Sequence, residues 1–164
     1  MIRHLPYIPI LAACIILLDI SSSHARSGSL SLGSGSGTPN QTFTVSVDMT
    51  NDTRIVGFQF DIVESVNAVD IVNVVIDSTH IDSTRQWNLH LNRKNAVTTK
   101  VVAFDFNLNG IPSGSGPFAE ITYRVRSDVL SGTYPIHLRA VVLADAGAGT
   151  IDDVTINDGS VTVV

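Results

Sequence analysis

The chain of 164 residues has one cysteine and one tryptophan, and its aromatic residues make up only 6% of the total. The cysteine, Cys14, lies in an apolar N-terminal stretch, so the rest of the chain has no thiol. That absence excludes disulfides, thiolate catalysis and cysteine metal sites from it. Basic residues are also scarce, since 10 Lys and Arg against 15 Asp and Glu give a net charge of −5. Nucleic-acid-binding proteins usually carry a basic patch, so we expect no nucleic-acid partner.

The first 25 residues are typical of an export signal. A polar start precedes an apolar run over residues 5–18, and Ser23 and Ala25 supply small side chains at the −3 and −1 positions of a cleavage site. The run is shorter than the roughly 20 residues that span a bilayer, so no membrane span is expected. We predict a secreted, extracellular protein that is cleaved after Ala25.

Two consequences follow for the chain as a whole. Residues 26–164 are long enough to form one domain that is held by its core alone, and we expect a monomer. The segment that ends at Cys14 also matches a bacterial lipobox, so a lipid anchor on Cys14 stays open as an alternative to cleavage after Ala25.

Apolar and polar residues alternate with a period of two along most of the mature chain, and no long apolar pattern has the helical period. The segments that predict strands are 42–49, 55–63, 69–76, 85–92, 100–107, 118–125, 133–145 and 159–164. A short edge strand is also plausible near Leu30 and Leu32. Eight or nine strands separated by polar turns, with no helices between them, predict an all-β antiparallel sandwich.

The alternation also predicts which side chains face the core. The expected core positions are Phe58, Phe60 and Ile62, then Trp87, Leu89 and Leu91, then Val102, Phe104 and Phe106. The expected outward positions are Gly57, Gln59 and Asp61, then Gln86, Asn88, His90 and Asn92, then Ala103 and Asp105.

Several segments, taken in order, resemble bacterial cohesin domains: VGFQFDIV, VVAFDF, GPFAEITYRV, SGTYPIHLRAVVLAD and NDGSVTVV. The resemblance implies a nine-stranded jelly-roll sandwich, similar to carbohydrate-binding modules, with no catalytic centre and no cofactor of its own. Cohesins bind dockerins, which are small calcium-loaded modules of secreted proteins, commonly polysaccharide-degrading enzymes. The calcium is therefore expected in the partner and not in this chain.

In the family, the third, fifth and sixth strands with part of the eighth form the partner face. That placement implies a partner-binding set of Gly57, Gln59, Asn88, His90, Asn92, Ala103 and Asp105. The alternation turns the same residues outward, so we predict one polar plate, with Asp105 and Asn88 as the main hydrogen-bond anchors. The plate lacks the tyrosine that often serves as an aromatic anchor in cellulosomal relatives.

The C-terminal segment from Asp145 to Asp158 contains four aspartates among glycines and could suggest a calcium loop. An EF-hand loop needs oxygen ligands at positions 3 and 5 and glutamate at position 12. From Asp145, positions 3 and 5 are Gly147 and Gly149, and no glutamate follows. We interpret this segment as a structural loop, which leaves the chain without a dockerin of its own.

The sequence gives little evidence for a catalytic site. Residues 77–84 hold Asp, Ser and His, but no nucleophile motif such as G-x-S-x-G accompanies them. His90 and His137 lack a third ligand at a spacing typical of zinc. Glu64 and Glu120 are the only glutamates, and neither is paired with an aspartate as a glycosidase requires.

We therefore predict a protein that is not an enzyme. The second hypothesis is a module that binds polysaccharide directly, which would need an exposed row of aromatic rings. A structural surface protein is the third.

Overall fold

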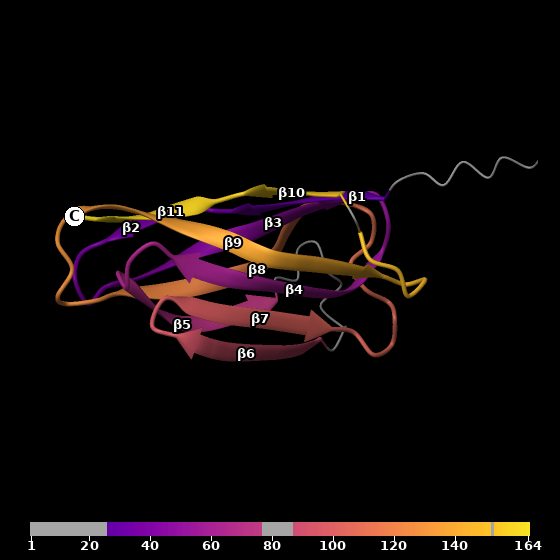
Figure 1. Ribbon diagram of the computed structural model, residues 1–164, viewed down its shortest axis with the longest axis horizontal. Helices are drawn as coiled ribbons and strands as arrows, with labels where there is room; N and C mark the ends of the chain where they lie inside the picture. Colours follow the sequence, from indigo (N-terminus) through magenta and orange to yellow (C-terminus); the bar gives the residue numbers. More distant parts are fainter. Residues whose placement is uncertain (1–25, 77–86, 152) are drawn as a thin grey trace, which may run out of the picture.

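The computed structural model describes residues 26–76, 87–151 and 153–164, which form two β-sheets packed against each other (Figure 1). Eleven strand segments occur in this part of the chain: β1 (Ser27–Leu32), β2 (Gly35–Gly37), β3 (Thr42–Asn51), β4 (Ile55–Glu64), β5 (Val69–Ile76), β6 (Asn88–Asn95), β7 (Thr98–Phe104), β8 (Gly114–Val125), β9 (Gly132–Asp145), β10 (Asp153–Asn157) and β11 (Gly159–Val163). The described ranges contain no helix that could cross a membrane.

One sheet has five strands in the order β10-β1-β3-β8-β5, and the other has six in the order β2-β11-β9-β4-β7-β6. The first strand of the chain is split between the sheets, because β1 pairs in the five-stranded sheet and β2 in the six-stranded one. The last strand is split in the same way into β10 and β11. With each split strand taken as one, the fold is the predicted nine-stranded jelly-roll sandwich.

The split of the last strand has a local cause. Gly159 lies so close to the chain at Gly33 that an added Cβ would come within 2.3 Å of the Gly33 carbonyl oxygen, so only glycine fits there. Asp158 interrupts the last strand, and its carboxylate accepts the Leu138 N–H at 2.9 Å and lies 2.7 Å from His137 Nδ1. Partial burial would raise the pKa of Asp158, but these two hydrogen bonds and the charge of Arg139 lower it overall.

The core lies between the sheets and contains a group of aromatic rings. Phe58 packs edge-on against Phe118 with ring centroids 4.9 Å apart, and it contacts Trp87 at 5.5 Å. Phe60 lies next to Phe58 and is fully buried. The predicted inward positions of β4 are therefore confirmed, as is the inward side of Trp87 and Leu89, which pack against the core.

The predicted facing of β7 is wrong by one residue. Val101 and Ala103 are buried against the core, whereas Val102 and Phe104 are only partly buried. Val101 pairs with Phe60 and Ala103 with Phe58 in the sheet, so these side chains share the inner surface. Because the phenylalanine rings already fill that space, β7 has room only for small inward side chains.

Candidate functional site: the outer face of the six-stranded sheet

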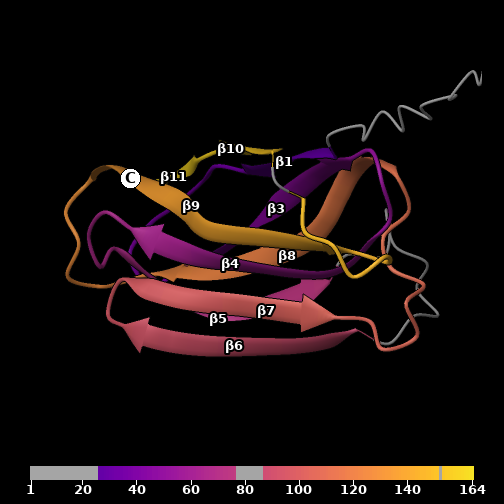
Figure 2. The ribbon, with the colours of Figure 1, turned by 45° about the vertical axis from the view of Figure 1, so that its right-hand side comes forward.

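Four neighbouring strands, β9, β4, β7 and β6, present a broad outer surface, which we call the β4 face (Figure 2). The register fixes which side chains lie beside one another on it. Gly57 of β4 pairs with Phe104 of β7, and Gln59 pairs with Val102. On the other side of β7, Phe104 pairs with Asn88 and Val102 with His90. The outward side chains of the four strands thus form continuous rows across the sheet.

A bulge in β9 completes the face. Ala140 has a positive φ of 49° and is the extra residue where the pairing with β4 shifts between Gln59 and Asp61. The bulge allows Leu138 and Leu143, an odd number of residues apart, both to point into the core. Val142, which pairs with Gln59, is thereby turned outward.

The structure brings together five of the seven residues predicted from the sequence. The residues whose register places them on the β4 face are Gly57, Gln59, Asn88, His90 and Asn92. Ala103 and Asp105 do not belong to it, because their side chains are only 1% and 3% exposed. The predicted outward orientation of these two residues is wrong, because the facing of β7 is shifted by one residue.

Asp105 organises the loop after β7. One carboxylate oxygen accepts the Asn107 N–H and the other accepts the Gly110 N–H, each at 2.9 Å. Its own N–H donates to the Val56 carbonyl at 2.9 Å. Its polar groups are thus used within the fold, so Asp105 cannot serve as the predicted anchor for a partner.

Two phenylalanine side chains lie outside the core at this end of β7. Phe104 lies on the β4 face, and its ring is nearly parallel to that of His90, with centroids 6.0 Å apart. Phe106 contacts Phe104 edge-on at 4.6 Å and is 75% exposed. The face is therefore not the continuous polar plate that the sequence predicted, because the rings of Phe104 and Phe106 lie next to its polar side chains.

A shallow hollow of about 230 Å³ opens on the β4 face beside Phe104. Its lining residues are Gly57, Phe58, Gln59, Val102, Ala103, Phe104, Val142 and Ala144. Val142 forms part of its wall and is 40% exposed. Apolar surface left open next to a polar rim is typical of a protein-binding site.

Positive charge gathers farther along the same face. Lys94 Nζ lies 2.6 Å from one carboxylate oxygen of Asp61, and Lys100 Nζ lies 3.7 Å from the other. Two ammonium groups thus share one carboxylate. The β4 face has an apolar end at Gly57 and Phe104 and a basic end around Asp61.

The C-terminal aspartate segment is used structurally at Asp145. Its buried carboxylate accepts the N–H groups of Gly147 at 2.6 Å and Gly149 at 3.2 Å, and it forms an ion pair with Arg26. Among the residues that the structure describes, no group of three His, Cys, Asp or Glu could hold a metal ion.

The other residues weighed as catalytic are separated from one another. His137 contacts Asp158, whereas His90 lies on Phe104. Glu64 is buried on β4, and Glu120 is exposed on β8 of the other sheet. Residues 77–84, the Asp-Ser-His segment, lie outside the described residues, as does the expected signal segment 1–25 and the expected outward Gln86.

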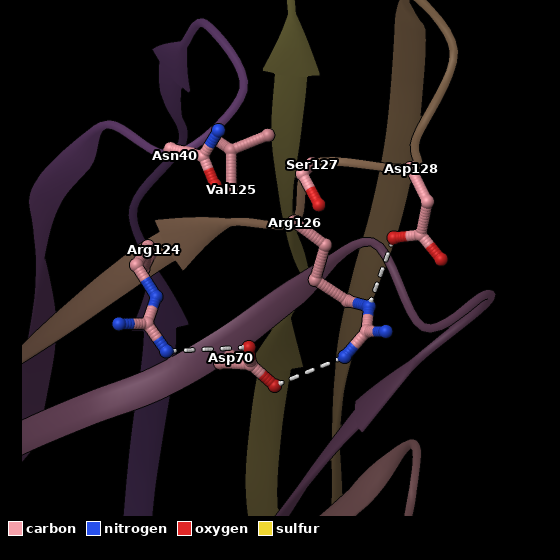
Figure 3. A pocket seen from close by; sticks show the side chains of 7 residues that line it. All are labelled: Asn40, Asp70, Arg124, Val125, Arg126, Ser127 and Asp128. Atoms are coloured by element: carbon pink, nitrogen blue, oxygen red, sulfur yellow. Dashed lines mark ion pairs between the residues drawn. The ribbon is translucent and has the colours of Figure 1, made fainter.

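A polar pocket of about 350 Å³ lies at the end of the five-stranded sheet (Figure 3). Asp70 sits between Arg124, at 3.7 Å, and Arg126, at 3.6 Å, and it also pairs with Arg93 of β6 at 3.5 Å. Arg126 also pairs with Asp128 at 3.3 Å. The cluster links the two sheets at this end of the molecule, and each of its three arginines is paired with an aspartate.

The comparison with family models gives a match to the cohesin domain over residues 28–163. Solved cohesin structures share the fold. The chain superposes on the CaDoc0917–CaCohA2 complex, whose CaCohA2 comes from Clostridium acetobutylicum, with a TM-score of 0.73 and 21% identity over 84% of this chain and 99% of that one.

Two further structures extend the similarity. The sixth cohesin of scaffoldin B from Acetivibrio cellulolyticus, solved in complex with a Cel5 dockerin, gives a TM-score of 0.70 at 16% identity, covering 84% of this chain and 99% of that chain. A non-cellulosomal cohesin from the archaeon Archaeoglobus fulgidus gives 0.67 at 18% identity, covering 84% and 91%. No curated protein matches the sequence. Since the family model spans nearly all of the described chain, the protein belongs to the cohesin family.

Proposed function

We propose that this protein is a non-catalytic receptor that binds the dockerin of a secreted partner through the β4 face. The observation that carries the proposal is the open apolar hollow at Gly57 and Phe104, which lies on the strands that the cohesin resemblance assigns to the partner. A cohesin of the same fold has been solved in complex with a dockerin. The calcium would belong to the dockerin, and polysaccharide-degrading enzymes are the partners that we expect.

The physical form of the face supports this function. Its four strands are hydrogen-bonded along their length, so the surface can receive a helix with little backbone movement. An apolar patch bordered by polar side chains is the usual anatomy of a protein interface, and a few residues of such a patch carry most of the binding energy. We therefore assign the main contact to Phe104 and the rim to Gln59, Asn88, His90 and Asn92.

Calorimetric titration against dockerins encoded in the same genome, with calcium present and then chelated, tests the proposal. Phe104→Ala should weaken binding by roughly tenfold or more, because truncation of a central aromatic anchor commonly costs at least about 1–2 kcal/mol. Val72→Ala, at an exposed position on the five-stranded sheet, serves as the control and should bind as the parent does. Failure of every dockerin to bind would refute the receptor function.

Direct glycan binding is the second candidate, because Phe104 and Phe106 are aromatic residues outside the core. Their rings are inclined by 79°, however, so they do not form one flat stacking platform. Retention on cellulose or xylan that is lost in Phe106→Ala, together with no affinity for dockerins, would favour this candidate over the receptor.

We further propose that the protein is exported as a monomer after cleavage behind Ala25. Support comes from Arg26, the next residue, which already takes part in the fold through its ion pair with Asp145. Mass spectrometry of the secreted protein should give a chain that begins at Arg26. A diacylglyceryl group on Cys14 would show instead that the protein is anchored to lipid.

A further inference from the structure

We infer that the β4 face selects an amphipathic helix that places one aliphatic side chain in the hollow over Gly57. The same helix carries an acidic side chain about two turns away, at the basic end around Asp61. The inference rests on the proposed dockerin-receptor function and adds to it the side-chain chemistry that the partner must have.

The hollow exists because Gly57 has no side chain. An added Cβ would find its nearest neighbours at 3.6–3.7 Å, which are ordinary contacts, and Gly57 is not among the glycines with positive φ. The backbone thus has no need for glycine here, although glycine inside a strand weakens it. What glycine provides at this position is open space between Phe104 and Val142.

The lining of the hollow determines which chemical group fits. Among the described residues that line it, only Gln59 has a polar side chain. A sugar ring would lose hydrogen bonds to water there and gain few in return, at a cost in free energy. An aliphatic side chain has no hydrogen bonds to water to lose, and it removes the exposed surface of Val142 and Phe104 from water.

The basic end fixes the second requirement. Asp61 lies four residues from Gly57 on the same strand, which corresponds to about 13 Å at roughly 3.3 Å per residue. Because Lys94 and Lys100 share the single carboxylate of Asp61, this end keeps an excess of positive charge. A carboxylate of the partner would balance that charge, and charge complementarity of this kind orients a partner and speeds its association.

These two points set a spacing on the helix. A helix rises about 1.5 Å per residue, so 13 Å corresponds to roughly eight or nine residues. Residues seven or eight apart lie on the same helix face. The partner helix should therefore present an aliphatic residue and, about eight positions away, an aspartate or glutamate.

A dockerin display library with randomised exposed helix positions provides the probe. Selection on the immobilised protein in calcium should enrich sequences with an aliphatic residue and an acidic residue at that spacing. The enriched dockerin should bind Gly57→Val about tenfold or more weakly than the parent, because the added side chain occupies the hollow. Gly57→Ala adds a single methyl group and should give an intermediate loss.

Gly132→Val is the matched control. Gly132 also lies in a strand of the six-stranded sheet, and an added Cβ would make only ordinary contacts, at 3.5–3.7 Å with Tyr134. Its variant should bind within about twofold of the parent. Lys100→Gln should slow association of the enriched dockerin by a fewfold at low salt and have less effect at high salt.

The outcomes separate the two proposals. If enriched dockerins bind Gly57→Val as tightly as the parent while its melting temperature is retained, the hollow is not the specificity site, although the receptor function stands. Enrichment of serine and threonine in place of aliphatic residues would also overturn the inference. If no library member binds, the receptor function fails, and this inference fails with it.

Discussion

The outer faces of the two sheets differ in chemistry although the strands share one core. The β4 face exposes an apolar hollow, two phenylalanines and, at one end, more lysines than acidic side chains. The opposite outer face, formed by β1, β3 and β8, is covered with hydroxyl-bearing side chains, and we call it the hydroxyl face. Hydrogen bonds join its members across the strands: Thr44 with Thr122 at 3.1 Å, Thr50 with Ser115 at 2.7 Å, and Asn157 of β10 with Ser31 at 2.9 Å.

A partner that covered the hydroxyl face would add little stabilisation. Its side chains already bond to one another, and threonine suits an exposed strand position. The exposed apolar residues of this sheet include Val72 and Val75 on β5 and Ile156 on β10, which are its two edge strands. Among the described residues, apolar area left open on strands inside a sheet is thus found on the β4 face, at Val142 and Phe104.

The largest expected effect is the difference in stability loss between a substitution on the inner side of β4 and one on the outer side of β7. Phe60→Ala should lower the free energy of unfolding by about 3–5 kcal/mol, because it opens a cavity in the filled core. Phe104→Ala should cost about 1 kcal/mol or less, since the ring lies outside the core. Urea denaturation of both variants measures the difference. Equal losses in the free energy of unfolding would show that Phe104 belongs to the core and not to the β4 face.

An intermediate effect concerns Glu64, whose carboxylate joins the two sheets. It accepts the Val69 N–H of β5 at 3.4 Å, and burial raises its pKa to about 7, although that hydrogen bond and the charge of Arg93 act in the opposite direction. Asp70 and Tyr123 also lie near it, and burial together with Glu64 raises the pKa of Tyr123. The unfolded chain loses this proton at lower pH than the folded chain does.

The sign of the pH dependence follows from this difference. The contribution of Glu64 to stability is complete below about pH 4.5 and is lost as the pH rises through about 7. Glu64→Gln keeps an acceptor for Val69 and removes the titration, so its stability relative to the parent should increase between pH 5 and pH 8. The gain should be on the order of 2 kcal/mol, because one pKa unit corresponds to about 1.4 kcal/mol. Thermal melts across that range measure it, and a constant difference would show that Glu64 does not titrate there.

The smallest effect is expected on the hydroxyl face. Thr44→Val removes one side-chain hydrogen bond at an exposed position and keeps the branched shape, so stability should change by less than about 0.5 kcal/mol. Dockerin affinity should not change. A clear loss of affinity in calorimetric titration would mean that the partner uses both faces, and the contrast between them would no longer hold.

The alternation along the chain predicted β4 well because its two sides differ strongly. Phe58, Phe60 and Ile62 alternate with glycine, glutamine and aspartate, so only one phase buries the apolar set. β6 was predicted almost as well, with Asn88 and His90 outward, although Leu91, expected inside, is 45% exposed.

On β7 the alternation could not predict which side chains face the core. Val101, Val102, Ala103 and Phe104 are all apolar, so alternation fits either phase, and residue size alone favours Val102 and Phe104 as the core positions. The correct phase depends on the volume of Phe58 and Phe60 in the neighbouring strand, which the sequence of β7 does not contain. The error carried over to Asp105, whose role depends on N–H groups two and five residues later.

The hollow could not be predicted from the sequence for a related reason. The sequence places Gly57 on the partner face, but a glycine leaves a recess only where the side chains of its neighbours extend beyond it. Those neighbours are Phe104 from β7 and Val142 from β9, and Val142 faces outward because of the bulge at Ala140. Such a site is a property of three strands and not of one.

The split first and last strands have a consequence for mechanical load. β1 runs parallel to β10 and β2 runs parallel to β11, and the start of β1 and the C-terminus lie at opposite ends of the molecule (Figure 1). A force that pulls these two ends apart therefore acts along the strands and loads their hydrogen bonds together in shear. The bonds cannot open one after another, as they would in a hairpin pulled from its end. The same pairing that closes both sheets thus lets the domain resist tension applied along its strands.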